Sequence, residues 1–303
     1  MLLEAVLLTI ITASTPLLIA AVGELVVERA GVLNLGVEGM MLMGAACGFA
    51  VAIITGSSLL GAVAGILAGT ALSALFALMV LGLAANQVAC GLALTILGMG
   101  ISGLAGESFV GARRDPSPKL HIAGLSDIPF VGPVLFGEDA FVYASFALLL
   151  AVWWFLARSR EGLALRAIGD NPVSAHALGH GVLRARLLAI LFGGACSGLA
   201  GAYLSLAYTP FWVKGMTAGR GWIALALVVF ASWRPFRLLL GAYLFGAVTV
   251  LQLHAQGFGL GIPSQLMSSL PYLATILVLV AISRARSYGA SPAALGMPFI
   301  PDR

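Results

Sequence analysis

The chain is a succession of long apolar runs separated by short polar stretches. A helix that spans a bilayer needs about 20 mostly apolar residues, and nine runs approach or exceed that length. This pattern predicts an all-α, polytopic integral membrane protein with about nine transmembrane helices, in one transmembrane domain over residues 1–303. The predicted spans are 2–22, 32–55, 58–83, 88–108, 140–157, 184–207, 219–233, 238–256 and 267–283.

Two of these runs begin with a polar, glycine-rich stretch. "AGVLNLGVEGMMLMGA" (30–45) carries Asn34 and Glu38, and "GMTAGRGWIALALVV" (215–229) repeats the arrangement weakly in the second half. Interrupted apolar segments in corresponding positions of two halves point to a transport site. We therefore expect broken helices here, whether or not the echo reflects an internal duplication.

Composition places the chain in the membrane class. It is 60% hydrophobic and 9% charged, with a mean hydropathy of +1.05, whereas soluble domains contain about 25% charged residues. The net charge of +4 does not indicate nucleic acid, because the basic residues lie in short loops between apolar runs. Most of the 16 Lys and Arg residues lie in loops on the same side of the membrane as the C-terminus. Because basic loops favour the cytoplasmic side, this distribution predicts an N-out, C-in orientation.

Polar groups at membrane depth are costly and therefore candidates for function. Glu38 has no basic neighbour in sequence, so an unwound backbone at Gly36 or Gly39 is expected to supply its hydrogen bonds. Asn34 either caps the following helix or lines a pathway. Glu24 and Glu28 are expected to pair with Arg29 at the inner edge.

Two loops stand out between the spans. The outer loop 109–139 is rich in Pro and Gly and long enough to pack over the outer mouth. The inner loop 158–183 contains "DNP", a helix start in which Asp170 or Asn171 is the cap and Pro172 lies in the first turn. A short cytoplasmic helix is therefore predicted, ending near Gly179 and Gly181.

Enzymatic chemistry is weakly supported. Ser102 in "GISG" and His254 on a later span are the residue types of a rhomboid-like intramembrane serine protease, but small residues in a span more often serve packing. His176 and His180 share a helix face without a third ligand, so no metal site or cofactor is expected. The chain has no phosphate-binding loop, so any ATP hydrolysis belongs to another chain.

Five blocks together resemble the permease subunits of ABC importers, in the branched-chain amino acid and simple-sugar permease family and particularly its nucleoside-type branch. The order and spacing of the blocks match over nearly the whole chain. They are "GELVVERAGVLNLGVEGMMLMGA" (23–45), "ANQVACGLAL" (85–94), "GLALRAIGDNPVSAHALG" (162–179), "FGGACSGLAGAYLSL" (192–206) and "MTAGRGWIALALVVFASWRP" (216–235).

The resemblance implies a transporter subunit rather than an enzyme. Its ATPase-coupling helix would comprise Arg166, Gly169, Asp170, Asn171, Pro172, Ala175 and Gly179, and the histidines at 176 and 180 depart from the small or apolar residues expected there. The substrate pathway would be lined by Asn34, Glu38, Asn86, Gln87 and Trp222. Phe211, Trp212 and Trp222 would stack on a base or sugar, unless they anchor the membrane interface.

The resemblance also implies the partners and the location. Partners would be cytoplasmic ABC ATPase subunits, a second permease subunit (homologous or identical), an extracytoplasmic substrate-binding lipoprotein, a small-molecule solute and membrane lipid, with no nucleic acid. The location would be a bacterial cytoplasmic (inner) membrane. A purine-type nucleoside is the expected solute, with a ribose-like simple sugar as the alternative. An ion-coupled carrier that needs no partner is a further alternative, disfavoured by the cytoplasmic helix.

Overall fold

A computed structural model describes residues 2–120, 131–257 and 291–301, together with a few single positions in 124–129 and 266–280. The described secondary structure is helical, apart from isolated bridges. The main helices are α1 (Leu2–Arg29), α2 (Val37–Thr55), α3 (Ser58–Ala77), α4 (Gln87–Ala105), α5 (Val131–Phe136), α6 (Ala140–Arg158), α7 (Arg160–Asp170), α8 (Pro172–Ala177), α9 (Val182–Tyr203), α10 (Arg220–Phe230) and α11 (Pro235–Gly257).

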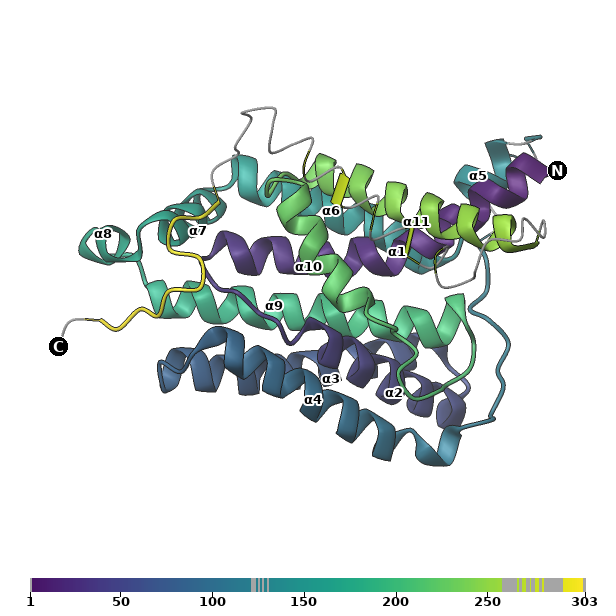
Figure 1. The fold of residues 1–303 in the computed structure, drawn as a ribbon, viewed down its shortest axis with the longest axis horizontal. Helices are drawn as coiled ribbons and strands as arrows, with labels where there is room; N and C mark the ends of the chain where they lie inside the picture. Colours follow the sequence, from purple (N-terminus) through teal and green to yellow (C-terminus); the bar gives the residue numbers. More distant parts are fainter. Residues whose placement is uncertain are drawn as a thin grey trace.

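Seven helices within the described residues are long and apolar enough to cross a membrane, which confirms a polytopic fold. They lie roughly along one direction, with α7, α8 and the last described residues at one end and α5 at the other (Figure 1). The predicted span 219–233 is wrong as a full span, because α10 has 11 residues and is only about 16 Å long. The ninth predicted span, 267–283, lies outside the continuously described residues.

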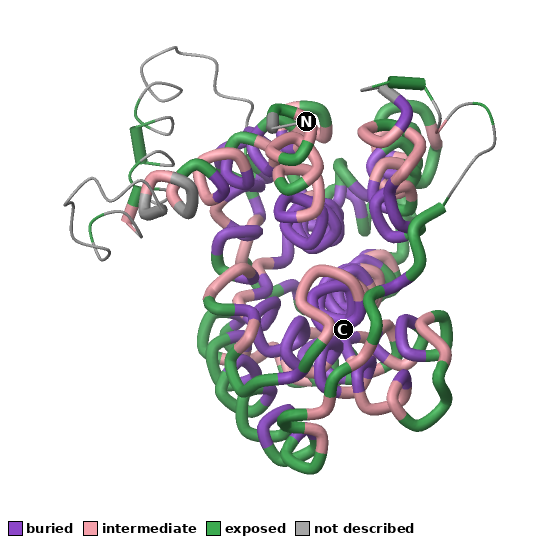
Figure 2. Tube along the Cα trace, turned by 90° about the vertical axis from the view of Figure 1, so that its right-hand side faces the viewer, coloured by how far each residue is buried: buried purple, intermediate pink, exposed green. Residues whose placement is uncertain are grey.

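The core is built around α9 and α1. α9 packs against α1, α2 and α3, and α1 also packs against α11, α10 and α6. The buried residues gather towards the middle of the bundle in the end-on view of Figure 2. α1, α2 and α9 are the most buried spans, whereas α4 and α6 keep most of their residues on the outside.

Glycines allow three helices to meet at backbone distance. Gly44 of α2, Gly65 and Gly69 of α3, and Gly198 of α9 lie so close that an added Cβ at any of them would collide with the backbone of a neighbouring helix. Helices associate in a bilayer mainly through close packing, because the lipid tails offer their apolar side chains equally favourable contacts. These small residues therefore explain why α2, α3 and α9 form the tightest part of the bundle.

The described part of the loop 109–139 crosses the end opposite α8. Arg113 forms an isolated bridge with Phe211, and the Ser117 N–H donates to the Leu206 carbonyl at 3.0 Å. Lys119 forms a second bridge with Asp139, the residue that caps α6 by accepting from the Phe141 and Val142 N–H groups. The expectation that loop 109–139 packs over this end is confirmed for these residues.

Candidate functional site

The chain leaves the helical conformation between α1 and α2. Residues 30–36 are not helical, and backbone groups released at membrane depth need partners from elsewhere in the protein. Side chains supply several of them. The Leu33 N–H donates to Gln87 Oε1 at 2.8 Å, the Asn34 N–H donates to Glu24 Oε1 at 3.2 Å, and the Ala30 carbonyl accepts from Arg186 Nε at 3.1 Å.

Asn34 shapes the turn that leads into α2. Its side-chain oxygen accepts from the Gly36 N–H at 2.9 Å, and Gly36 itself is the residue that precedes the helix. Of the two roles expected for Asn34, the helix cap is therefore wrong, because its hydrogen bond closes a turn before α2 begins. The side chain is fully buried.

Glu38, in the first turn of α2, holds the start of α10. Its Oε1 accepts from Thr217 Oγ1 at 2.6 Å and from the Gly219 N–H at 2.8 Å, and its Oε2 accepts from the Gly221 N–H at 2.7 Å. The expected donors near Gly36 and Gly39 do not supply these bonds. A carboxylate at a helix N-terminus is favoured by the helix dipole and by the free N–H groups there.

The two interrupted segments therefore meet within the bundle. We call residues 30–38 and 217–221 the helix junction. Gly39 of α2 lies against Leu94 and Thr95, near the middle of α4, so the junction lies at about mid-depth. α10 starts there and ends at Phe230, close to the end of α1, where Trp233 meets Glu28.

The last described residues cover the α8-side end of this junction. Arg186 of α9, which is fully buried, donates from Nη1 to the Met297 carbonyl at 3.1 Å. The Gly296 N–H donates to the Gly31 carbonyl at 3.2 Å, and the Ala294 N–H donates to the Gly169 carbonyl at 3.0 Å. Residues 291–301 thus join the break in α1–α2 to the end of α7.

The buried acids on α1 are not paired with Arg29 as expected. Glu24 accepts from the Asn34 backbone, and Glu28 Oε2 accepts from the Trp233 indole at 2.6 Å. Arg29 instead donates to the Trp233 carbonyl at 2.8 Å. Hydrogen bonds to irregular backbone and to an indole replace the expected ion pairs, because the α10–α11 turn comes close to this end of α1.

The predicted pathway residues separate into two groups. Asn34, Glu38 and Gln87 are buried and bonded at the junction. Asn86 is exposed and caps α4 by accepting from the Ala89 N–H, and Trp222 is 39% exposed on the outer face of α10.

The two aromatic residues before α10 also differ in exposure. Phe211 is 42% exposed, whereas Trp212 is 1% exposed and packs between Leu42, Phe49 and Gly106. The hypothesis that Trp212 stacks on a solute does not fit its burial in this structure.

The short helix predicted from the "DNP" start to near Gly179 and Gly181 is present as α8, over Pro172–Ala177. Asn171 rather than Asp170 is its cap, accepting from the Ser174 N–H at 2.9 Å, and Gly179 ends it with φ +87°. Gly169 and Ala175 point inward: Gly169 lies against Arg29 and Gly31, and Ala175 packs with Phe299. The exposed apolar residues at this tip are Val173 at 65% and Leu178 at 80%.

The alternative chemistries gain no support. Ser102 lies inside the regular helix α4 and donates back to the Met99 carbonyl. α4 and α11 lie on opposite sides of the bundle in Figure 1, and the His254 side chain lies outside the described residues.

The metal-site alternative concerns the histidines near α8. His176 packs edge-on against Phe299. No cluster of three metal-binding side chains occurs in the described part of the chain.

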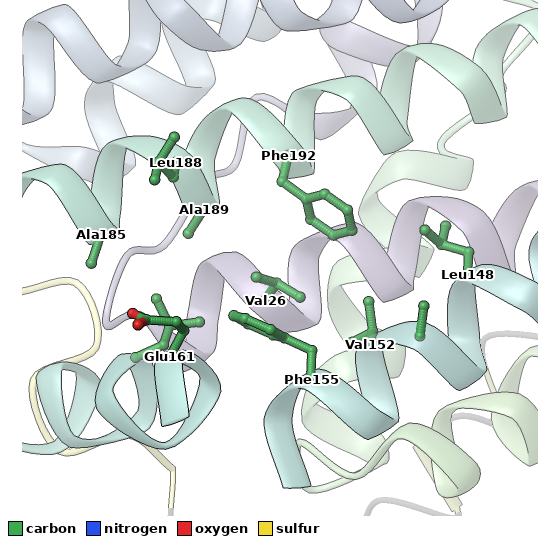
Figure 3. Close-up of a pocket in the computed structure, with 11 residues that line it drawn as sticks. Val26, Leu148, Val152, Phe155, Glu161, Ala185, Leu188, Ala189 and Phe192 are labelled. Carbon is green, nitrogen blue, oxygen red and sulfur yellow. The ribbon is translucent and has the colours of Figure 1, made fainter. Parts of the chain in front are cut away.

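A lateral cavity of about 480 Å³ lies between α1, α6, α7 and α9. Figure 3 shows Phe155 and Phe192 pointing into it, with the Glu161 carboxylate at one edge. Its lining is otherwise apolar. A solute site is expected to combine apolar walls with several convergent polar groups, so this cavity does not suit a sugar or a nucleoside.

Sequence reasoning missed several residues that hold the site together. Thr217, Gly219 and Gly221 bind Glu38, and Arg186 ties the break to the C-terminal segment. The first three belong to the polar, glycine-rich stretch 215–229, which weakly repeats the arrangement of residues 30–45. Nothing in the sequence indicated that the two echoed segments touch one another.

Comparisons with known proteins agree with this architecture. The family described as "Branched-chain amino acid transport system / permease component" matches residues 6–282. TsgC13 of Haloferax volcanii, named provisionally as a glucose ABC transporter permease, is 45% identical over 94% of each chain. The guanosine ABC transporter permease NupQ of Bacillus subtilis is 32% identical, over 95% of this chain and 93% of its own.

A nucleoside ABC transporter permease of Lactococcus lactis, NupC, is 28% identical over 91% of this chain and 92% of its own. No solved structure matches the chain. As an ABC permease, the protein acts with a separate ATPase and a solute-binding protein. The chain belongs to the branched-chain amino acid transport permease family and is the multi-pass membrane permease component of an ABC transporter, not itself an enzyme.

Proposed function

We propose that this permease admits a simple sugar, in the direction of import. The supporting observation is the 45% identity to a protein named provisionally for glucose, along nearly the full length of both chains. The nucleoside expected from the sequence is the second candidate, supported by 32% identity to a guanosine permease over a similar length. Both solutes are polar, so both need a path through the bundle that the apolar cavity does not offer.

In this proposal the helix junction is the element that moves. Glu38 joins α2 to α10, so a displacement of one broken helix is transmitted to the other through three hydrogen bonds. Trp222, one residue after the last donor and exposed on α10, is the residue that we place against the solute. Asn34 and Gln87 brace the junction rather than line the path.

We place α7 and α8 in the cytoplasm, with α8 docking on the ATPase through Val173 and Leu178. A second permease subunit, identical or homologous, completes the path. The partner on the other side is a solute-binding protein, which in a bacterium is lipid-anchored. The ATPase supplies the energy, because this chain contains no phosphate-binding loop.

Uptake of labelled glucose, ribose and guanosine, compared in cells with and without the gene, tests the solute. Loss of sugar uptake alone supports the proposal, and loss of guanosine uptake alone moves the function to the second candidate. A Trp222→Ala variant is expected to change the KM for the transported solute. Val229→Ala is the matched control, because Val229 is also exposed and lies about two turns further along α10.

A further inference from the structure

A second cavity, of about 460 Å³, lies where α1, α6 and α7 meet the α10–α11 turn. We call it the arginine cavity, because Arg29, Arg166, Arg234 and Arg237 all line it. It is at the end of the bundle that carries α7 and α8. Neither the solute path nor the α8 tip uses it.

The cavity carries more positive charge than its surroundings neutralise. The charges of Arg166 and Arg234 act repulsively on Arg29, and Asp170 is the carboxylate that counters them. Glu28 lies nearby, but its Oε2 is engaged by the Trp233 indole. No ion pair joins the four arginines to an acid within the described part of the chain. Four guanidinium groups gathered around a single nearby counter-charge, that of Asp170, leave excess positive charge that favours an anion, and phosphate oxygens suit their geometry.

Two of the arginines are held and two are available. Arg29 donates to the Trp233 carbonyl at 2.8 Å, and Arg166 donates to the Leu156 carbonyl at 3.4 Å. Arg234 is exposed and Arg237 is half-buried. The turn that carries them has Ser232 and Trp233 at positive φ, +51° and +54°, a strained conformation that a protein retains where the surroundings impose it.

Aromatic side chains also line the cavity. Trp153 of α6 and Phe236 of α11 pack with ring centroids 5.5 Å apart, and Trp233 is a third lining residue. Trp is enriched at the level of lipid headgroups, and the cavity lies where two apolar spans end, at Arg158 and Pro235. This combination distinguishes a lipid site from a surface for a soluble anion.

We propose that the arginine cavity binds the phosphate headgroup of an anionic phospholipid from the leaflet on the α7–α8 side. Basic pockets between spans on the cytoplasmic side are the expected sites for such headgroups. The bound lipid bridges α1, α7 and α11. It therefore links the helix junction, through the end of α1, to the helices that project from the membrane.

The test uses the full-length chain in detergent, titrated with dioleoyl-phosphatidylglycerol, with dioleoyl-phosphatidylcholine or with inorganic phosphate, and followed by thermal shift and native mass spectrometry. We expect phosphatidylglycerol to bind and to raise Tm, and phosphatidylcholine not to. The double variant Arg234→Gln/Arg237→Gln is expected to bind phosphatidylglycerol about thirtyfold more weakly, from the contribution of two basic residues at a membrane surface. The Arg234→Lys/Arg237→Lys variant is expected to retain most of the binding.

Arg160→Gln/Arg184→Gln is the matched control, because both residues are exposed at the same end but do not line the cavity. An equal loss in the control, or no loss in the cavity variant, overturns the proposal. Protection by inorganic phosphate equal to that by phosphatidylglycerol overturns the lipid source and leaves a site for a free anion. Loss of ATPase co-purification with unchanged lipid binding assigns the arginines to protein docking instead. None of these outcomes depends on which solute is transported.

Discussion

Gly221 at the start of α10 donates its backbone N–H to Glu38 Oε2 at 2.7 Å, across 183 residues of chain. Together with the bonds from Thr217 and Gly219, this contact links α2 to the start of α10 through one carboxylate. The arrangement explains why an acid is tolerated at membrane depth. Three hydrogen-bond donors and the positive end of the α10 dipole stabilise the negative charge of Glu38, so no basic side chain is needed.

Replacing Glu38 should impair transport more than membrane insertion. Glu38→Gln keeps an acceptor but removes the charge and is expected to cost about 1–3 kcal/mol at the junction. Glu38→Ala removes all three bonds and should cost more. Solute uptake, normalised to the amount of protein in the membrane, measures the effect. Glu107→Gln, exposed beyond the end of α4, is the control, and full activity of Glu38→Ala would contradict a role for the junction.

Gly221→Ala should damage the same site by overpacking. A Cβ at this position would lie 2.5 Å from the backbone of Glu38, so the helices must separate. We expect a loss of about 1–3 kcal/mol, seen as a lower Tm in detergent and weaker uptake. Gly100→Ala is the matched control, because a Cβ there meets nothing within 4 Å and alanine favours the helix. Equal behaviour of the two variants would show that the close approach is unimportant.

The exposed tip of α8 is expected to couple transport to ATP hydrolysis. Val173→Glu or Leu178→Glu should lower ATP-driven uptake by about tenfold or more, equivalent to about 1.4 kcal/mol of docking free energy, without lowering Tm. The ATPase should co-purify less with these variants. Leu163→Glu on α7, which is also exposed, is the control.

Ala175→Glu should behave differently, because Ala175 is buried against Ile168, Val182 and Phe299. A charge there is expected to destabilise the α7–α8 pair, so Tm and protein yield should fall together with uptake. A stable Ala175→Glu protein that is merely uncoupled would contradict its inward orientation.

The stability of the end opposite α8 should depend on pH through Glu138. Burial raises the pKa of this carboxyl from 4.5 to about 7, despite the nearby positive charge of Lys119. Below about pH 4.5 the group is neutral in both the folded and unfolded chain, so it costs nothing. As the pH rises towards and through 7, ionisation favours the unfolded chain, and Tm should fall. Glu138→Gln should flatten this part of the Tm profile between pH 5 and 8.

The number and order of the spans were largely readable from the apolar runs, because a helix in lipid must satisfy its own backbone hydrogen bonds. The positions of α1, α2, α3, α4, α6, α9 and α11 follow from that local requirement. The short helix α8 was equally local, since Asn171, Pro172 and Gly179 cap, start and end it. The nucleoside expectation rested on resemblance, and the comparisons favour the sugar alternative.

Tertiary structure alone decided which groups meet. The sequence showed that Glu38 needed partners, but the donors lie about 180 residues away and became partners only when α10 was packed beside α2. The same holds for Gly169 and Ala175, which a helical pattern could not orient, and for the four arginines that three separate segments bring to one cavity. Local hydrogen bonding and apolar length determine where helices form, whereas close packing of glycine faces determines which of their polar groups come within bonding distance.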